Sequence, residues 1–156
     1  MASNRHLGRI VALQTLYERD FRMECGDKDV SLIDTLDRNI ERYSETIDDK
    51  EFIVTLVNGV SEKQDNLDAA LQPLAPEWPL SQIARIDRIV LRIGLYELTY
   101  DNNVPPKVVI NEAVELAKAF GSENSSKFIN GVLGTALRNI EDTTEPEAPK
   151  KTKKDN

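Results

Sequence analysis

The segment 85–98 limits the possible folds of this chain more than any other stretch, because its apolar residues cover two sides of a helix. One side carries Ile86, Ile89, Val90 and Ile93, and the other carries Leu91, Leu95 and Leu98. A helix that is apolar on two sides is normally buried between neighbouring helices. We therefore expect this segment to be the central helix of a bundle, with Arg85, Arg88 and Arg92 on its narrow remaining face.

Apolar residues at helical spacing continue before and after this segment. They predict further helices at about 3–24, 31–44 and 49–72, a short helical turn at the start of 80–101, and two more helices within 105–140. Pro106 suits the first turn of a helix, and Gly121 is expected to end that helix in a left-handed conformation. Strand-like alternation is missing over any useful length. The sequence thus predicts an all-α fold of about seven helices in two small helical bundles.

Three prolines fall within the seven residues 73–79, and this density excludes regular structure there. We expect one domain over 1–141, with a boundary at this loop between subdomains at about 1–72 and 80–141. Trp78 is expected to fill the junction between them. Because residues 142–156 lack large apolar side chains and are rich in charge and proline, we expect a disordered tail.

The net charge of −7, from 20 basic and 27 acidic residues, is the opposite of what a general nucleic-acid binder shows. The first ten residues are an exception, because they hold Arg5, His6 and Arg9 and no acid. The single cysteine, Cys25, excludes an intrachain disulfide and favours a reducing, cytosolic compartment. With one histidine and one cysteine, we expect no metal site and no catalytic triad. No apolar run approaches the roughly 18 residues of a membrane span.

Four segments resemble the NusB family of bacterial transcription antitermination factors, in matching order over roughly 5–140. They are RHLGRIVALQTLYERDF at 5–21, LRIGLYEL at 91–98, VPPKVVINEAVELAKAFG at 104–121 and SSKFINGVL at 125–133. The resemblance implies an RNA- and protein-binding factor that needs no cofactor and is not an enzyme. Such a factor pairs with NusE, a ribosomal small-subunit protein, and binds boxA RNA in nascent ribosomal transcripts. The complex joins RNA polymerase with NusA and NusG. A homodimer is a further possibility that the sequence leaves open.

The resemblance also implies which residues contact RNA. Arg5 and Arg9 match basic positions of the family, and His6 aligns where another base is common. The junction of the two C-terminal helices adds Lys118, Ser122, Asn124, Lys127 and Phe128. The alternative is a solvated helix end for the charges and a core position for the aromatic ring. Phe120 fits the apolar stripe and is expected in the core, whereas Phe128 at the stripe edge is able to stack on an unpaired base.

A second set of residues is a candidate for binding a protein partner. Tyr17 and Asp87 match the family positions that hold NusE, and Arg85 and Arg88 lie beside Asp87 in the sequence. Tyrosine and arginine are enriched at interface hot spots. The alternative is a core position for Tyr17 and solvated surface for the charges. We assign structural roles to Asn111, Glu112 and Asn130. Glu112 lies in the first turns of its helix, where the helix dipole favours a carboxylate, and a buried amide such as that of Asn130 usually bonds a helix end or a backbone group.

Two other functions remain open from the sequence. A NusB-like domain forms the N-terminal part of a ribosomal RNA cytosine methyltransferase, so the chain is also a candidate RNA-binding module for such an enzyme. It holds no Gly-rich nucleotide loop and no cysteine pair, and catalysis would need another polypeptide. The third possibility is a protein scaffold without an RNA role.

Overall fold

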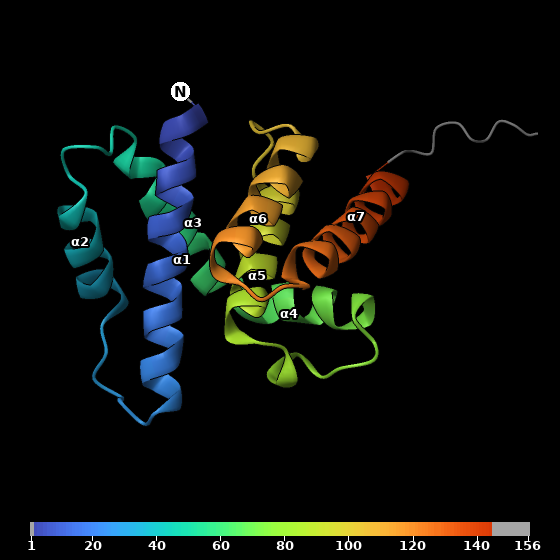
Figure 1. The fold of residues 1–156 in the computed structure, drawn as a ribbon, viewed down its shortest axis with the longest axis horizontal. Coiled ribbons are helices and arrows are strands. Elements are labelled where there is room, and N and C mark those ends of the chain that lie inside the picture. The colour runs from blue at the N-terminus through green and yellow to red at the C-terminus, as the bar shows by residue number, and fades with distance from the viewer. Residues whose placement is uncertain (1, 145–156) are drawn as a thin grey trace, which may run out of the picture.

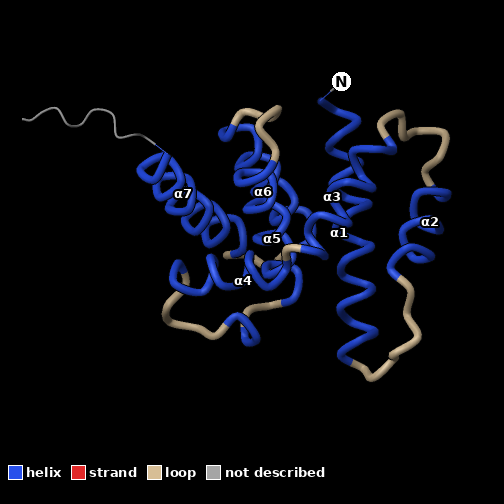
Figure 2. Tube along the Cα trace, turned by 180° about the vertical axis from the view of Figure 1, so that it is seen from behind, coloured by secondary structure: helices blue, strands red, loops and turns tan. Residues whose placement is uncertain are grey.

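The computed structural model describes the backbone of residues 2–144 and the side chains of residues 5–143. The described chain holds seven α-helices and two short 3-10 helices, and no strand occurs in it (Figure 2). The α-helices are α1 (Ala2–Glu24), α2 (Leu32–Arg42), α3 (Lys50–Glu62), α4 (Gln64–Leu71), α5 (Arg85–Tyr100), α6 (Pro106–Phe120) and α7 (Ser125–Thr144), and the 3-10 helices are η1 (Gln72–Leu74) and η2 (Leu80–Gln82). The predicted all-α class and the number of helices are confirmed.

The helices form the two predicted bundles, which share a continuous core. Helix α1 packs against α2 and α3, while α5, α6 and α7 pack against one another (Figure 1). Helix α5 also contacts α1 and α3, and α4 contacts both α3 and α5. The two bundles are therefore joined through α5 and α4. The predicted domain limits, 1–141 with a division at 73–79, are not tested by this packing and stay predictions.

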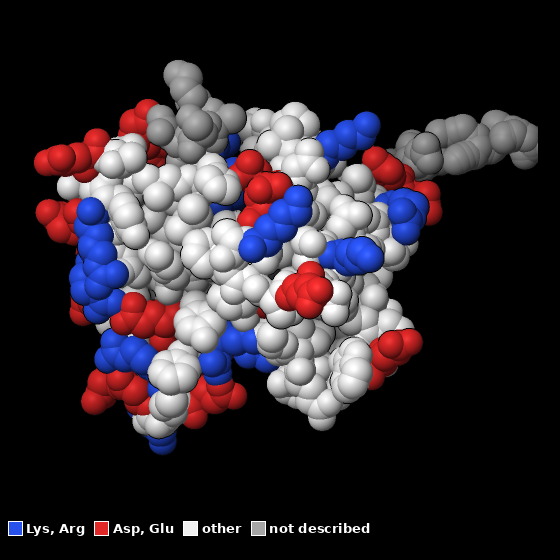
Figure 3. Space-filling model, viewed as in Figure 1, with Lys and Arg blue, Asp and Glu red and all other residues white. Residues whose placement is uncertain are grey.

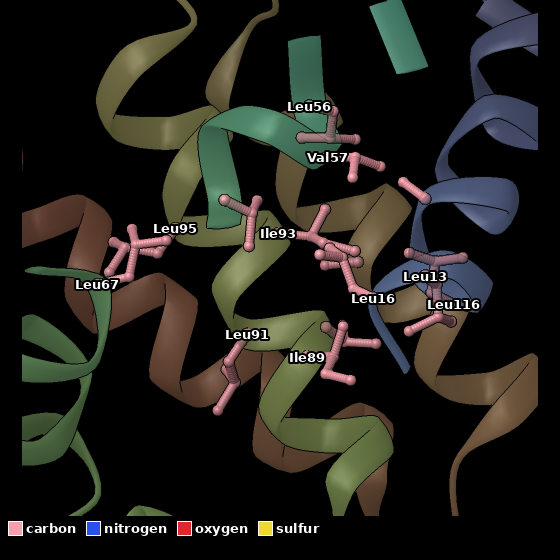
Figure 4. Packing of buried hydrophobic residues seen from close by; sticks show 14 of the residues in the cluster. Leu13, Leu16, Leu56, Val57, Leu67, Ile89, Leu91, Ile93, Leu95 and Leu116 are labelled. Atoms are coloured by element: carbon pink, nitrogen blue, oxygen red, sulfur yellow. The ribbon is translucent and has the colours of Figure 1, made fainter. Parts of the chain in front are cut away.

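Helix α5 is the central helix that its two apolar sides predict. Its buried residues include Ile89, Val90, Leu91 and Ile93. Figure 4 shows Ile89, Leu91 and Ile93 among labelled residues of α1, α3, α4 and α6. Full burial of one such side chain stabilises the folded chain by roughly 1.5–3 kcal/mol. The apolar residues on the two sides of this one helix therefore account for a large part of the core.

Two predictions around the end of the first bundle are wrong. The helix expected over 49–72 is broken at Lys63, because α4 turns to bury Leu67 and Leu71. Trp78 does not fill the junction, since 57% of it is exposed. The proline-rich loop is instead held by Gln72, whose amide donates to two carbonyls of the loop and accepts from the backbone N–H of Leu80. This arrangement places Trp78 on the outside.

The end of α6 also differs from the prediction. Phe120, expected in the core, is the last residue of α6 and is 41% exposed. Gly121 is extended, with φ −95° and ψ −167°, and is not left-handed. Glycine is required here by a close approach. A Cβ atom at this position would lie 2.6 Å from Ser125 Oγ and 2.8 Å from the carbonyl oxygen of Ala117. The buried Ser125 Oγ accepts from the backbone N–H of Ser122 at 2.8 Å and thereby sets the turn.

Replacing Gly121 with alanine is expected to lower the free energy of unfolding by about 1–3 kcal/mol, because overpacking forces backbone atoms to shift. The matched control is Gly131→Ala in α7, where an added Cβ meets no atom within 4 Å. That change is expected to stabilise the chain by about 0.5–1 kcal/mol through helix propensity. Urea unfolding followed by circular dichroism measures both. Equal effects of the two changes would contradict the close approach at Gly121.

The C-terminal end of the described chain is helical. Helix α7 continues to Thr144 and so includes the first residues of the predicted tail, while 145–156 lie outside the described residues. Two glycines of α7 are not sites of close helix approach, because an added Cβ at Gly131 would meet no atom within 4 Å and one at Gly134 would come only within 3.9 Å of Arg138 in the same helix. None of the helices in the part of the chain that is described is long and apolar enough to cross a membrane.

Candidate RNA-binding and partner-binding surfaces

Arg9, expected to project outward with Arg5, is buried between α1 and α5. Its guanidinium donates two hydrogen bonds to Glu97, at 2.8 Å from Nε and 2.7 Å from Nη2. The exposed fractions of the two side chains are only 3% and 2%. Burial lowers the pKa of Arg9, but the hydrogen bond and charge of Glu97 outweigh it and leave this pKa above the ordinary value. The prediction of an exposed Arg9 is therefore wrong, because α5 supplies a buried carboxylate opposite it.

The two other basic residues at the start of α1, Arg5 and His6, also face carboxylates of the same chain. Arg5 Nη2 lies 3.3 Å from Asp49 Oδ2, and His6 Nδ1 lies 2.8 Å from Glu112 Oε1. Glu112 Oε1 is also 3.8 Å from Arg9 Nη1. A segment that is basic in the sequence is thus paired with acids in space. Space-filling Figure 3 shows the same pattern on one face of the molecule, where lysine and arginine side chains lie interleaved with acids.

One aromatic ring supports both arginines of this segment. The guanidinium carbon of Arg5 lies 4.5 Å from the ring centroid of Phe52, and that of Arg9 lies 5.1 Å from it. Phe52 is itself packed into the core at the start of α3. Cations are attracted to the faces of aromatic rings at such distances. Arg5 is therefore held in a defined position even though its side chain remains partly exposed.

The junction of α6 and α7 brings most of the other predicted RNA contacts to the surface. Lys118, Ser122, Asn124 and Lys127 are exposed, and Phe128 is half-buried against the core. Lys118 makes one exposed ion pair, of 3.6 Å, with Glu115. Exposed ion pairs of this kind contribute little to stability. Both lysines of the junction are accordingly accessible to an anionic ligand.

A hollow of about 300 Å³ joins this junction to the start of α5; we call it the junction hollow. It is lined by Trp78, Gln82, Ile83, Ala84, Asp87, Ser122, Asn124, Ser125 and Phe128. Asp87 is 8% exposed, and its Oδ1 atom is buried without a hydrogen-bond partner among the described residues. A buried acceptor without a donor destabilises a protein by about 1–3 kcal/mol. In this hollow Asp87, a predicted partner contact, therefore lies beside three predicted RNA contacts, Ser122, Asn124 and Phe128.

The arginines of α5 are not the solvated stripe that was one alternative. Arg85 Nε donates to Asp20 Oδ2 at 2.8 Å, and Arg88 Nη2 donates to the same oxygen at 3.2 Å. Arg92 forms two hydrogen bonds with Asp68, of 2.8 and 2.9 Å. Burial raises the pKa of Asp20, but the arginines around it outweigh this effect and lower that pKa below the ordinary value of 3.8. These arginines therefore hold α5 to α1 and α4.

Arg85 also contacts two aromatic rings of α1. Its guanidinium carbon lies 5.5 Å from the ring centroid of Tyr17 and 5.2 Å from that of Phe21. The two rings are stacked, with their centroids 6.5 Å apart. Tyr17 is half-buried, whereas 47% of Phe21 is exposed. We call Tyr17, Phe21 and Arg85 the aromatic–arginine face; its composition is that of an interface hot spot.

Three acids that organise these sites were not among the residues predicted from the sequence: Asp20, Asp49 and Glu97. Glu97 carries a visible signal, because it is a single charge between the apolar residues of a helix expected to be buried on two sides. Asp20 and Asp49 carry no comparable signal, since each pairs with an arginine far away in the sequence. In the part of the chain that is described, no group of three His, Cys, Asp or Glu side chains is placed to hold a metal ion. Cys25 is exposed.

Comparisons with known proteins agree with this architecture. The model of the NusB family matches residues 6–138. The transcription antitermination protein NusB of Dehalococcoides mccartyi strain CBDB1 is 41% identical over 143 residues, which cover 92% of this chain and 96% of that protein. The NusB of Chloroflexus aggregans is 45% identical over 139 residues, covering 88% of this chain and 89% of that protein.

Solved structures show the same fold. The T. maritima NusB structure superimposes with a TM-score of 0.77 at 32% identity and covers 86% of this chain and 90% of that one. A crystal structure of the antitermination factors NusB and NusE in complex with dsRNA has a TM-score of 0.77 at 22% identity and covers 89% of this chain and 99% of that one. The family match includes residues of every helix in both bundles, and the chain belongs to the NusB family.

Proposed function

We propose that this protein is a transcription antitermination factor that binds boxA RNA and NusE at adjoining surfaces. Its relatives carry the name of transcription antitermination protein, and a protein of the same fold has been crystallised with NusE and RNA. In this proposal it is a binding factor without a cofactor and not an enzyme. It works in the cytosol and joins RNA polymerase together with NusA and NusG.

The observation that carries the proposal is the junction hollow. Asp87, whose Oδ1 atom is buried without a hydrogen-bond partner among the described residues, lines it together with Ser122, Asn124 and Phe128. A buried carboxylate that lacks a donor is suited to a donor from another molecule, and pairing would recover the energy that the unpaired oxygen costs. The aromatic–arginine face lies on another side of α5, because Arg85 and Asp87 are two positions apart in its first turn and such positions do not share a helix face. We assign Asp87 and the aromatic–arginine face, on two sides of the start of α5, to NusE.

The RNA surface in this proposal runs from the junction to the start of α1. Lys118 and Lys127 are placed to contact phosphates, which give register, while Phe128 is placed to stack on an unpaired base. Ser122 and Asn124 have exposed polar groups that suit hydrogen bonds to the same RNA. Arg5 and His6 extend the surface along α1. Arg9 supports it from beneath, because its donors are taken by Glu97.

Replacing Phe128 with leucine is expected to weaken boxA RNA binding about five- to tenfold, because leucine keeps the packing but cannot stack as an aromatic ring does. NusE binding is expected to stay unchanged. The measurement is a fluorescence anisotropy titration of labelled boxA RNA, alone and with NusE, at two salt concentrations. Tyr100→Leu is the matched control, because Tyr100 is an exposed aromatic residue at the far end of α5. Unchanged RNA binding by Phe128→Leu would show that Phe128 does not stack on a base, whereas a chain that binds no boxA RNA with or without NusE would favour a protein scaffold.

A further inference from the structure

The ion pairs of the first turns of α1 differ in how easily they open. The pair of Arg9 with Glu97 has two short hydrogen bonds and is almost completely buried. The pair of Arg5 with Asp49 has one contact of 3.3 Å, and its side chains are 36% and 41% exposed. Breaking a buried ion pair is costly, whereas an exposed one is worth little. Asp49 is therefore an exchangeable partner of Arg5, and Glu97 is a permanent partner of Arg9.

The position of Arg5 does not depend on Asp49. Glu97 holds Arg9, the guanidinium of Arg9 lies against one ring, and the same ring of Phe52 carries the guanidinium of Arg5. Arg5 thus keeps a supported, partly exposed guanidinium when its anionic partner changes. A hollow of about 450 Å³, lined in part by Arg5, Arg9, Asp49 and Glu112, adjoins the pair and leaves space for a phosphate group.

Asp49 itself is kept in place by a second task. It is the N-cap residue of α3, and its Oδ1 accepts from the backbone N–H of Phe52 at 3.1 Å. Its other oxygen, Oδ2, contacts Arg5. Because the cap holds the carboxylate, Asp49 cannot turn away from Arg5 without loss of this hydrogen bond. A phosphate that approaches Arg5 therefore meets a fixed negative charge.

We propose that Asp49 stands at the place of an RNA phosphate and that RNA binding exchanges this carboxylate for the phosphate at Arg5. The inference rests on the proposed RNA-binding function and concerns how that binding is regulated. Carboxylates and phosphates accept the same hydrogen bonds from a guanidinium. Asp49 thus competes with every RNA for Arg5, and it lowers the affinity of the protein in the absence of its partner.

The test uses Asp49→Asn in the full chain, because asparagine is as good an N-cap as aspartate and should preserve the stability of α3. Labelled single-stranded boxA RNA is titrated and followed by fluorescence anisotropy over a series of salt concentrations. We expect the variant to bind about three- to tenfold more tightly at low salt. We also expect the plot of log K against log salt to become steeper by up to about 0.7, the value of one additional phosphate contact on a single strand.

Two further variants show whether the effect passes through Arg5. Asp37→Asn removes the same charge from an exposed site on α2 that is distant from Arg5. Its neighbour Arg38 pairs with Glu18, and Glu18 lies about 20 Å from Arg5 along α1. Asp37→Asn is expected to change the affinity by less than a factor of about two. In an Arg5→Gln background, Asp49→Asn is expected to lose its effect, and an equal gain in both backgrounds would overturn the exchange at Arg5.

The outcomes separate this inference from the function on which it rests. If Asp49→Asn and Asp37→Asn bind boxA RNA as the unaltered chain does, the exchange is overturned while RNA binding stands. If neither the unaltered chain nor any variant binds boxA RNA, with or without NusE, the proposed function is overturned and the exchange with it. A tighter, more salt-sensitive Asp49→Asn whose gain requires Arg5 supports both.

Discussion

The Glu97→Leu variant is expected to unfold with a free energy about 3–5 kcal/mol below that of the unaltered chain, because the change leaves the charge of Arg9 buried without its main partner. Glu112 Oε1, at 3.8 Å from Arg9 Nη1, is too distant to replace two short hydrogen bonds. Domains of this size are stable by about 5–15 kcal/mol, so the change removes a large share of the total. Urea unfolding followed by helical circular dichroism measures the loss.

The double variant Arg9→Met/Glu97→Leu distinguishes the unpaired charge from lost packing. Replacing a buried ion pair with apolar side chains of similar volume is often neutral or stabilising, so the double variant should recover most of the stability that either single change removes. Arg5→Met is the control, because its ion pair with Asp49 is exposed and should be worth less than about 1 kcal/mol. A double variant whose loss equals the sum of the single losses would show that the charges do not act as a pair.

The backbone of this fold is predictable from the sequence because burial of apolar residues follows helical periodicity. The two apolar sides of 85–98 correctly identified α5 as the central helix, and the stripes of the other segments located their helices. The errors lie at helix ends. Phe120 and Trp78 are apolar residues in a favourable pattern, but one is the last residue of its helix and the other lies in a loop tied by Gln72. Helical periodicity does not show where the neighbouring helices that would bury such a residue end.

The candidate sites were less predictable because charge pairing depends on contacts between distant segments. Arg9 and Glu97 are separated by 88 positions, and Arg85 and Asp20 by 65. An arginine stripe has the same sequence pattern whether the arginines pair with carboxylates of another helix or are exposed to solvent. For this reason the basic positions of α1 and α5 were located correctly along their helices, while the exposure predicted for Arg9 was wrong and the arginines of α5 are largely engaged. The roles of these residues in binding stay predictions.

The second large effect is expected at Asp87, where Asp87→Asn should weaken binding of NusE about 30-fold or more, since removing one charge of a buried interfacial pair costs 2–5 kcal/mol. The free protein should keep its stability to within about 1 kcal/mol, because Oδ1 has no hydrogen bond to lose and only the favourable position at the start of α5 is affected. Loss of NusE binding without loss of stability would indicate that Asp87 contributes to partner binding and not to the stability of the fold.

Surface plasmon resonance with immobilised NusE separates this role from a general effect of charge. A desolvated pair acts mainly on the dissociation rate, whereas an exposed charge at the rim acts on the association rate and is screened by salt. Asp142→Asn, an equal change of charge at an exposed site near the end of α7, is the control and should alter neither rate appreciably. If Asp87→Asn changes only the association rate, or leaves both rates unchanged, Asp87 does not pair with NusE.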